Sequence, residues 1–144
     1  MSADAPEVAR GGHYAEANGL SIYYKERGTG HPLVLLQAGF DTHHIWDSQV
    51  PVWEPHFRVI TPDSRGLRRT DHPGGPISYE LLARDAIARI HALGLEKPLI
   101  CGIGDGACVA LQVAIWGTWP CRCIRVHGCL AVERERGINR GAGC

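Results

Sequence analysis

The pattern of apolar and polar positions predicts a chain that opens with an antiparallel hairpin and continues with buried parallel strands. Segments 13–17 and 20–26 flank Asn18 and Gly19, a dipeptide typical of a type I′ hairpin turn. Segment 33–36 is a continuous apolar run, which is typical of a parallel strand covered on both faces. Two further runs of strand length lie at 57–60 and 99–101.

Helical periodicity is clearest over residues 79–93. Ser78 is expected to cap the N-terminus of this helix, and Gly94 is expected to end it. Its apolar face is predicted to contain Leu82, Ala83, Ala86, Ile87, Ile90 and Leu93.

The remaining elements complete an alternation of strand and helix. A helix of small residues is predicted at 107–116, and a shorter helix at 45–50 is expected to end at Pro51 or Pro55. One more strand is possible at 126–132. This order produces a parallel sheet with right-handed crossovers, so the predicted fold class is α/β.

The two ends of the chain lack this pattern. Residues 1–12 are small and polar and are predicted to be a flexible leader, and residues 133–144 are predicted to be an irregular tail. A chain of 144 residues is long enough for one domain with a core of its own, and two domains are not expected. That core is placed at 13–132.

Charge and composition argue against several classes of partner. The 15 basic and 15 acidic residues give no net charge, which argues against nucleic acid or an anionic membrane as partner. No apolar run approaches the ~18 residues of a membrane span, and the first residues lack a secretion signal, so a cytoplasmic protein is expected. In that reducing compartment Cys101 and Cys108 are expected to be thiols in small apolar positions.

A metal site is not expected. Cys121, Cys123, His127 and Cys129 are ligand types for zinc, but the first pair is spaced more tightly than Cys-x2-Cys and no second pair follows. Three loop histidines near the expected cleft are predicted to be solvated rather than catalytic: His43, His44 and His72.

Four places, in this order and at these spacings, resemble the α/β-hydrolase superfamily over about residues 14–116. The first two are the Asn18-Gly19 hairpin and the strand at 33–36 with the Gln37-Ala38-Gly39 that follows it, where the family has a strand ending in His-Gly. The third is Pro62-Asp63-Ser64-Arg65-Gly66, where the family has Asp-x-Arg-Gly-x-Gly-x-Ser. The fourth is Gly102-Ile103-Gly104-Asp105-Gly106, which matches the Gly-x-Ser-x-Gly nucleophile elbow. The resemblance implies a three-layer α/β fold with a mostly parallel sheet, truncated before the later strands that carry the family's acid and histidine.

The resemblance also implies roles for individual residues. In the family a serine, or sometimes an aspartate or cysteine, attacks the substrate from the elbow without a cofactor, and two backbone amides stabilise the oxyanion. Here those amides would belong to Asp105 and to Gly39 or Phe40. Gly104 occupies the nucleophile position and has no side chain with which to attack.

Other positions also bear on the chemistry. Asp105 is a poor substitute nucleophile, because an elbow centred on it needs glycines or small residues two positions before and after it, where Ile103 and Ala107 stand. Asp63 and Arg65 are expected to hold their loop by local hydrogen bonds rather than to act on a substrate. Gln37 replaces the family's loop histidine, and Leu67-Arg68 interrupts the Gly-x-Gly part of the third motif.

Three hypotheses follow. The first is an α/β-hydrolase-fold protein from a lineage of cofactor-independent hydrolases of esters or related bonds, inactive as written. The second is a non-catalytic binding or regulatory module, which uses the cleft for a small molecule or an open sheet edge beside strand 99–101 for self-association. The third is an incomplete product of a longer hydrolase reading frame, with a shifted frame after about residue 117.

Overall fold

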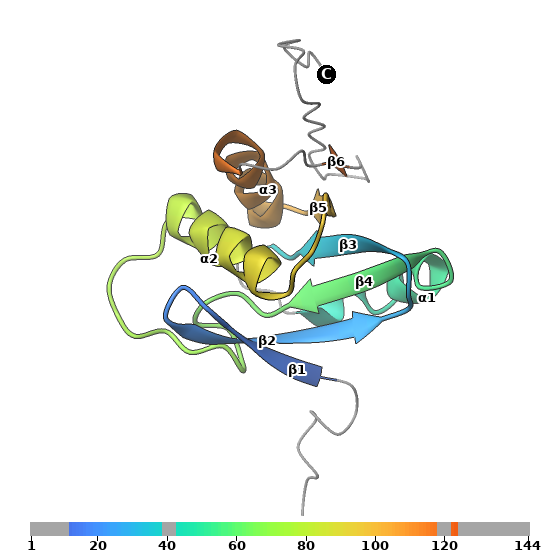
Figure 1. Cartoon of the computed structure of the whole chain (residues 1–144). Helices are drawn as coiled ribbons and strands as arrows, with labels where there is room; N and C mark the ends of the chain where they lie inside the picture. The colour runs from blue at the N-terminus through green and yellow to red at the C-terminus, as the bar shows by residue number, and fades with distance from the viewer. Residues whose placement is uncertain (1–11, 39–42, 118–121, 124–144) are drawn as a thin grey trace, which may run out of the picture.

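The computed structural model describes residues 12–38, 43–117 and 122–123. Their strands form one sheet in the order β1-β2-β4-β3-β5-β6 (Figure 1). The strands are β1 (Gly12–Ala17), β2 (Leu20–Arg27), β3 (His31–Leu36), β4 (Phe57–Pro62), β5 (Leu99–Gly102) and β6 (Arg122–Cys123). The helical elements are the 3-10 turn η2 (His43–Trp46) and the helices α1 (Val50–Trp53), α2 (Tyr79–Ala92) and α3 (Asp105–Trp116).

The chain begins with the predicted hairpin. Strands β1 and β2 pair antiparallel with Ala17 opposite Leu20. Asn18 and Gly19 have φ values of 51° and 74°, and a type I′ turn needs a positive φ at both central residues. The hairpin prediction is confirmed.

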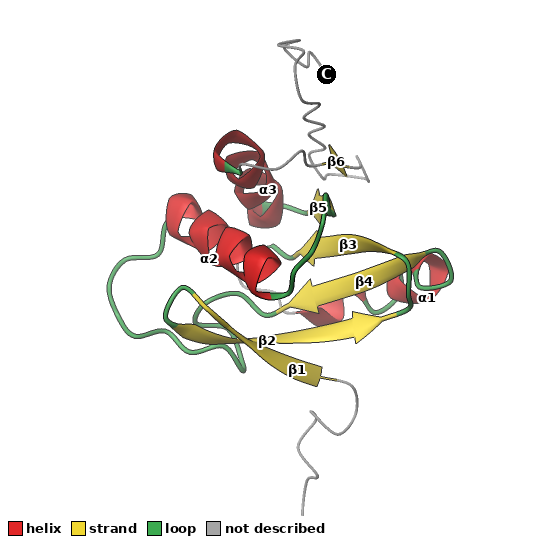
Figure 2. Ribbon diagram, in the orientation of Figure 1, coloured by secondary structure: helices red, strands yellow, loops and turns green. Residues whose placement is uncertain are grey.

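Strand β3 lies in the middle of the sheet, with a parallel neighbour on each side. Val34 is paired with Ile60 of β4 and with Ile100 of β5. Side chains of β3 alternate between two cores: Val34 packs with α2 and α3, whereas Leu33 and Leu35 pack with Trp46 on the other face. The helices therefore cover both faces of the sheet, as the apolar run in β3 predicted (Figure 2).

Helix α2 has the predicted start and end. The Ser78 hydroxyl accepts a hydrogen bond from the Leu81 amide at 3.1 Å, and Gly94 follows the helix with φ of 61°. The buried side chains of α2 also include Asp85 and Arg89, which the pattern of apolar positions did not reveal.

Two predicted helix boundaries were wrong. In place of one helix at 45–50, the chain forms η2 and then α1, and Pro51 lies in the first turn of α1 rather than at a helix end. Proline is tolerated there because its missing amide proton has no partner in the first helical turn. Helix α3 begins at Asp105, two residues before the predicted start, because the turn at Gly104 leads directly into it.

Several predictions fall on segments outside the described residues. These are leader residues 1–11, the strand at 126–132, the tail at 133–144, the amides of Gly39 and Phe40, and the cysteine-histidine group that includes Cys121, His127 and Cys129.

Strand β1 begins at Gly12, the last residue assigned to the leader. Strand β5 has a parallel neighbour on its far side in β6. Within the described ranges no helix is long and apolar enough to cross a membrane, and Cys101 and Cys108 form no disulfide.

Candidate functional site

The turn between β5 and α3 has the geometry of an elbow, with Gly104 at its exposed tip. Gly104 has φ of 56° and ψ of −123°, a conformation that glycine adopts without the steric penalty of a side chain. The Ile103 amide donates to the Leu36 carbonyl at 3.0 Å, and the Ala107 amide donates to the Gly104 carbonyl at 3.0 Å. The turn is therefore fixed to the end of β3 and to the first turn of α3.

Close backbone packing explains why the residues two positions before and after the tip, Gly102 and Gly106, are glycines. A Cβ atom on Gly106 would lie 2.2 Å from the Leu36 carbonyl oxygen, and one on Gly102 would lie 2.1 Å from the Gly106 carbonyl oxygen. Both contacts are with backbone atoms, which cannot move aside as a side chain does. Helix α3 approaches β3 and β5 this closely only because Gly106 and Gly102 are glycine.

The nucleophile position has no reactive atom. A Cβ atom on Gly104 would lie 3.0 Å from the Cβ atom of Ala38, so even a small side chain would touch the loop that follows β3. The neighbouring Asp105 is half-buried, and its Oδ1 accepts a hydrogen bond from the Tyr79 hydroxyl at 2.5 Å. This hydrogen bond and the carboxylate charge raise the pKa of Tyr79 to about 12. The contact joins the N-terminal ends of α2 and α3.

Asp63, at the carboxyl end of β4, is fully buried against His43. Oδ1 of Asp63 accepts from the backbone amide of His43 at 3.1 Å and from its Nδ1 at 2.6 Å. Only 1% of the His43 surface is exposed, so the expectation of a solvated histidine was wrong for this residue. The three predicted loop histidines differ in exposure: His44 is exposed beside Asp47, and His72 is half-buried with its ring near the Gly75 carbonyl.

Arg65 joins the loop after β4 to helix α2. Its Nε and Nη2 donate to the two carboxylate oxygens of Asp85 at 2.9 and 2.8 Å, and Asp85 raises the pKa of Arg65. The side-chain amide of Asn18 donates to the same carboxylate at 2.8 Å. These hydrogen bonds connect the hairpin turn, the loop and α2, so Arg65 acts across the fold rather than locally.

A pocket of about 270 Å³ lies between the end of β3, the loop after β4, α2 and the first turns of α3. Gln37 lines it, and its Nε2 donates to the Ser64 hydroxyl at 3.0 Å. Arg89 of α2 also lines it and is 3% exposed. Among the residues that the structure describes, Nε and Nη2 of Arg89 have no hydrogen-bond partner. Burial lowers the pKa of Arg89 to about 10, and the charge of Asp85 opposes this effect.

Arg89 was missed in the sequence, although a signal for it was present. It follows Leu82 and Ala86 at helical spacing, which places an arginine on the side of α2 that faces the sheet.

In the described part of the chain no group of three or more His, Cys, Asp or Glu side chains is placed to hold a metal ion.

Comparison with known proteins agrees with this geometry. A family model described as alpha/beta hydrolase fold matches residues 31–124, which include the elbow and the loop after β4. The chain belongs to the α/β-hydrolase family.

The α/β-hydrolases to which it is similar include epoxide hydrolases. The soluble epoxide hydrolase of Corynebacterium sp. (strain C12) is 32% identical over 102 residues, which are 71% of this chain and 36% of that protein. Epoxide hydrolase 3 of Siraitia grosvenorii is 36% identical over 97 residues, 65% of this chain and 30% of that protein. The solved structure of epoxide hydrolase CorEH without ligand has a TM-score of 0.69 and 32% identity, over 72% of this chain and 36% of that one. This chain spans about a third of the length of these relatives.

The family pattern extends further along the loop after β4 than the sequence suggested. Thr70 stands at the serine position of Asp-x-Arg-Gly-x-Gly-x-Ser, where its hydroxyl donates to the Asp63 carbonyl at 2.9 Å and accepts from the Tyr23 amide at 3.0 Å. Arg68 stands at the position of the second glycine and has φ of 47°. The loop thus follows the α/β-hydrolase pattern with a threonine at the serine position and an arginine in the left-handed backbone conformation at the second glycine position.

Proposed function

We propose that this chain binds a small molecule in the pocket beside the elbow without hydrolysing it. It would be a non-catalytic member of a lineage of cofactor-independent hydrolases that act on esters or related bonds such as epoxides. The observation that carries the proposal is Gly104, a residue without a side chain, at the tip of an otherwise intact elbow.

The chemistry of the family supports this proposal. Its reaction begins with attack by a side chain at the elbow tip, and no backbone atom substitutes for that nucleophile. Asp105, one position further on, has its carboxylate engaged by the Tyr79 hydroxyl.

The features of a binding site remain. Asp105 is the first residue of α3, where the helix dipole favours a negatively polarised oxygen. The pocket beside it is lined mostly by apolar groups with a few buried polar ones, a composition typical of small-molecule sites. A ligand therefore has an apolar enclosure and a polarised end.

The test begins with the whole chain and two substrates, p-nitrophenyl acetate and styrene oxide. We expect no turnover of either above the rate in buffer. Multiple turnovers by the wild-type chain, measured as product formed per chain, would contradict the proposal.

A second arm asks whether the elbow still activates a nucleophile when one is supplied. In Gly104→Cys a thiol would lie at the N-terminus of α3, which lowers thiol pKa values. We expect p-nitrophenyl acetate to acylate residue 104 once per chain, located by peptide mass spectrometry. Ile115→Cys is the control, because Ile115 is 62% exposed near the other end of α3. Equal acylation rates at 104 and 115 would mean that the elbow has lost its oxyanion geometry.

A further inference from the structure

We propose that Arg89 makes the pocket a carboxylate site, so that the ligand is a small organic anion whose carboxylate binds the guanidinium of Arg89. This inference rests on the proposed binding function and adds the chemical class of the ligand. It assigns a role to a residue that the family motifs do not include.

The first observation is an ionic side chain placed in the interior without a pairing group. Arg89 is 3% exposed, lines the pocket, and has no hydrogen-bond partner at Nε or Nη2 among the described residues. A buried charge is strongly unfavourable unless it is paired and hydrogen-bonded. An anion bound in the pocket would supply both.

The second observation is that two other arginines of this fold bind a carboxylate through Nε and Nη2, which form one edge of the guanidinium. Nε and Nη2 of Arg58 donate to the two oxygens of Glu26 at 2.6 and 3.1 Å. The same two atoms of Arg65 donate to the two oxygens of Asp85. This edge of a guanidinium matches a carboxylate with two parallel hydrogen bonds. The complement of Arg89 is therefore a carboxylate.

Asp85, four residues before Arg89 on α2, does not fill this role. Its Oδ2 accepts from Arg65, and its Oδ1 accepts from both Arg65 and Asn18. The three charged groups Arg65, Asp85 and Arg89 carry two positive charges and one negative charge. Of the three, Arg89 is the one whose Nε and Nη2 have no hydrogen-bond partner among the described residues.

Two other carboxylates line the pocket, and each accepts a hydrogen bond at Oδ1, whereas Oδ2 of Asp63 is buried with no hydrogen-bond partner among the described residues. Oδ1 of Asp63 is held by His43, and Oδ1 of Asp105 is held by the Tyr79 hydroxyl. They restrict the anion to the Arg89 part of the pocket.

The rest of the lining sets the size and polarity of the ligand. Apolar side chains of four elements surround the pocket: Ile22, Leu36, Leu82, Ala86 and Val109. A volume of about 270 Å³ suits a molecule of the size of phenylacetate. Phenylacetamide has the same shape without the charge, so the pair isolates the contribution of the carboxylate.

The experiment titrates the full chain with phenylacetate and with phenylacetamide near pH 7 and follows binding by NMR chemical shifts. We expect the wild-type chain to prefer the carboxylate by about tenfold or more, since charge-assisted hydrogen bonds are the strong ones. Arg89→Met should remove the preference and leave amide binding unchanged. Arg89→Lys keeps the charge but not the two-pronged geometry, and should retain only part of the preference.

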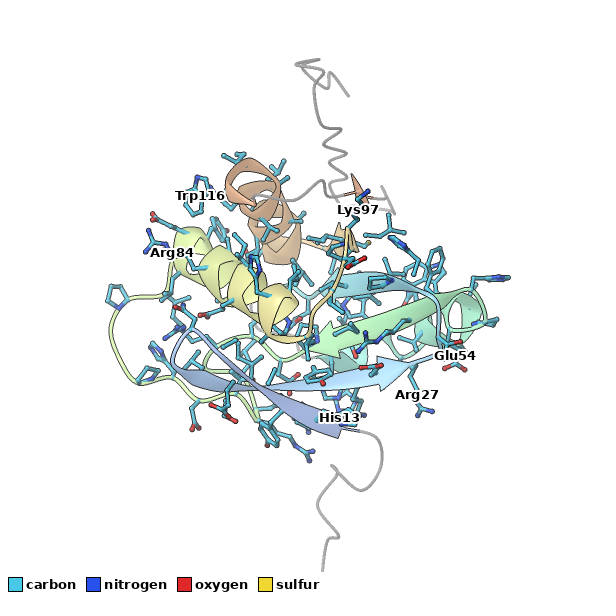
Figure 3. The ribbon with its side chains drawn as sticks, in the orientation of Figure 1. His13, Arg27, Glu54, Arg84, Lys97 and Trp116 are labelled. Atoms are coloured by element: carbon cyan, nitrogen blue, oxygen red, sulfur yellow. The ribbon has the colours of Figure 1, made fainter. Side chains whose placement is uncertain are left out.

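The matched control is Arg84, on the same helix and labelled in Figure 3, whose side chain is 63% exposed and pairs with Glu80. Arg84→Met should leave both affinities unchanged. If the wild-type chain binds both ligands equally, or if Arg84→Met matches Arg89→Met, the carboxylate inference is overturned and the proposed binding function stands. If neither ligand binds, while circular dichroism shows a folded chain, the inference and the proposed function both fail.

Discussion

Gly104 has a backbone conformation that residues with a side chain adopt only at a cost in free energy. In α/β-hydrolases that carry a nucleophile at the elbow tip, the reacting residue itself bears that strain. Here φ is 56° and no Cβ atom is present. Glycine at position 104 therefore both removes the nucleophile and relieves the backbone strain.

Gly104→Ala should lower the free energy of unfolding by about 1–2 kcal/mol. The cost arises from the positive φ and from a Cβ contact of 3.0 Å with Ala38. Urea denaturation measures it, with Gly94→Ala as control, because Gly94 has φ of 61° but no heavy atom within 4 Å of the added Cβ. The control should lose less stability than Gly104→Ala. An unchanged or increased stability of Gly104→Ala would show that the elbow is not strained.

The elements differ in how far their sequence alone predicted them. The hairpin, β3 and α2 were predicted because each depends on a local signal: the Asn18-Gly19 turn, an uninterrupted apolar run, or helical spacing with a cap at Ser78. The prediction for the short helix α1 was wrong, because the pattern of apolar positions does not say whether Pro51 begins or ends a helix. The partners of Asp63 and Arg65 lie 20 residues away in the chain, and such pairings arise only from the assembled sheet.

Helix α2 is held to the rest of the fold by the buried pair of Asp85 and Arg65, and this gives the next prediction. Asp85→Ala should cost about 3–5 kcal/mol, since it leaves the Arg65 guanidinium buried without its partner. The comparison is Glu80→Ala, which breaks the exposed ion pair with Arg84 on the same helix and should cost less than ~1 kcal/mol. Thermal and urea unfolding of both variants measure the difference. Similar losses would mean that the buried pair does not hold α2 in place.

The pocket is a property of the whole molecule, because five separate segments meet there. The parallel sheet brings the carboxyl ends of β3, β4 and β5 to one edge, and α2 and α3 cover the adjacent face (Figure 1). Two of the sequence motifs, the elbow and the loop after β4, lie at that edge. They did not show that α2 contributes an arginine to it, since a single charged residue at helical spacing is usually solvated.

The buried charge of Arg89 should set how the stability of the whole chain depends on alkaline pH. Its pKa is lowered from 12.5 to about 10 in the folded chain, so its charged form favours unfolding at every pH below about 10. As pH rises through 10 the folded state releases this proton first, and the penalty declines. Arg89→Met lacks the penalty and should be more stable than the wild-type chain near pH 8, by about 1–3 kcal/mol without ligand.

That advantage should shrink as the pH rises from about 9 to about 11. Tyr79 titrates nearby with the opposite sign, because its pKa is raised to about 12 and the contribution of its neutral form is lost above pH 10. Both proteins contain Tyr79, so its effect cancels in the difference between them. Urea unfolding of the two proteins at several pH values tests the prediction. A difference that stays constant or grows with pH would mean that burial does not lower the pKa of Arg89 into this pH range.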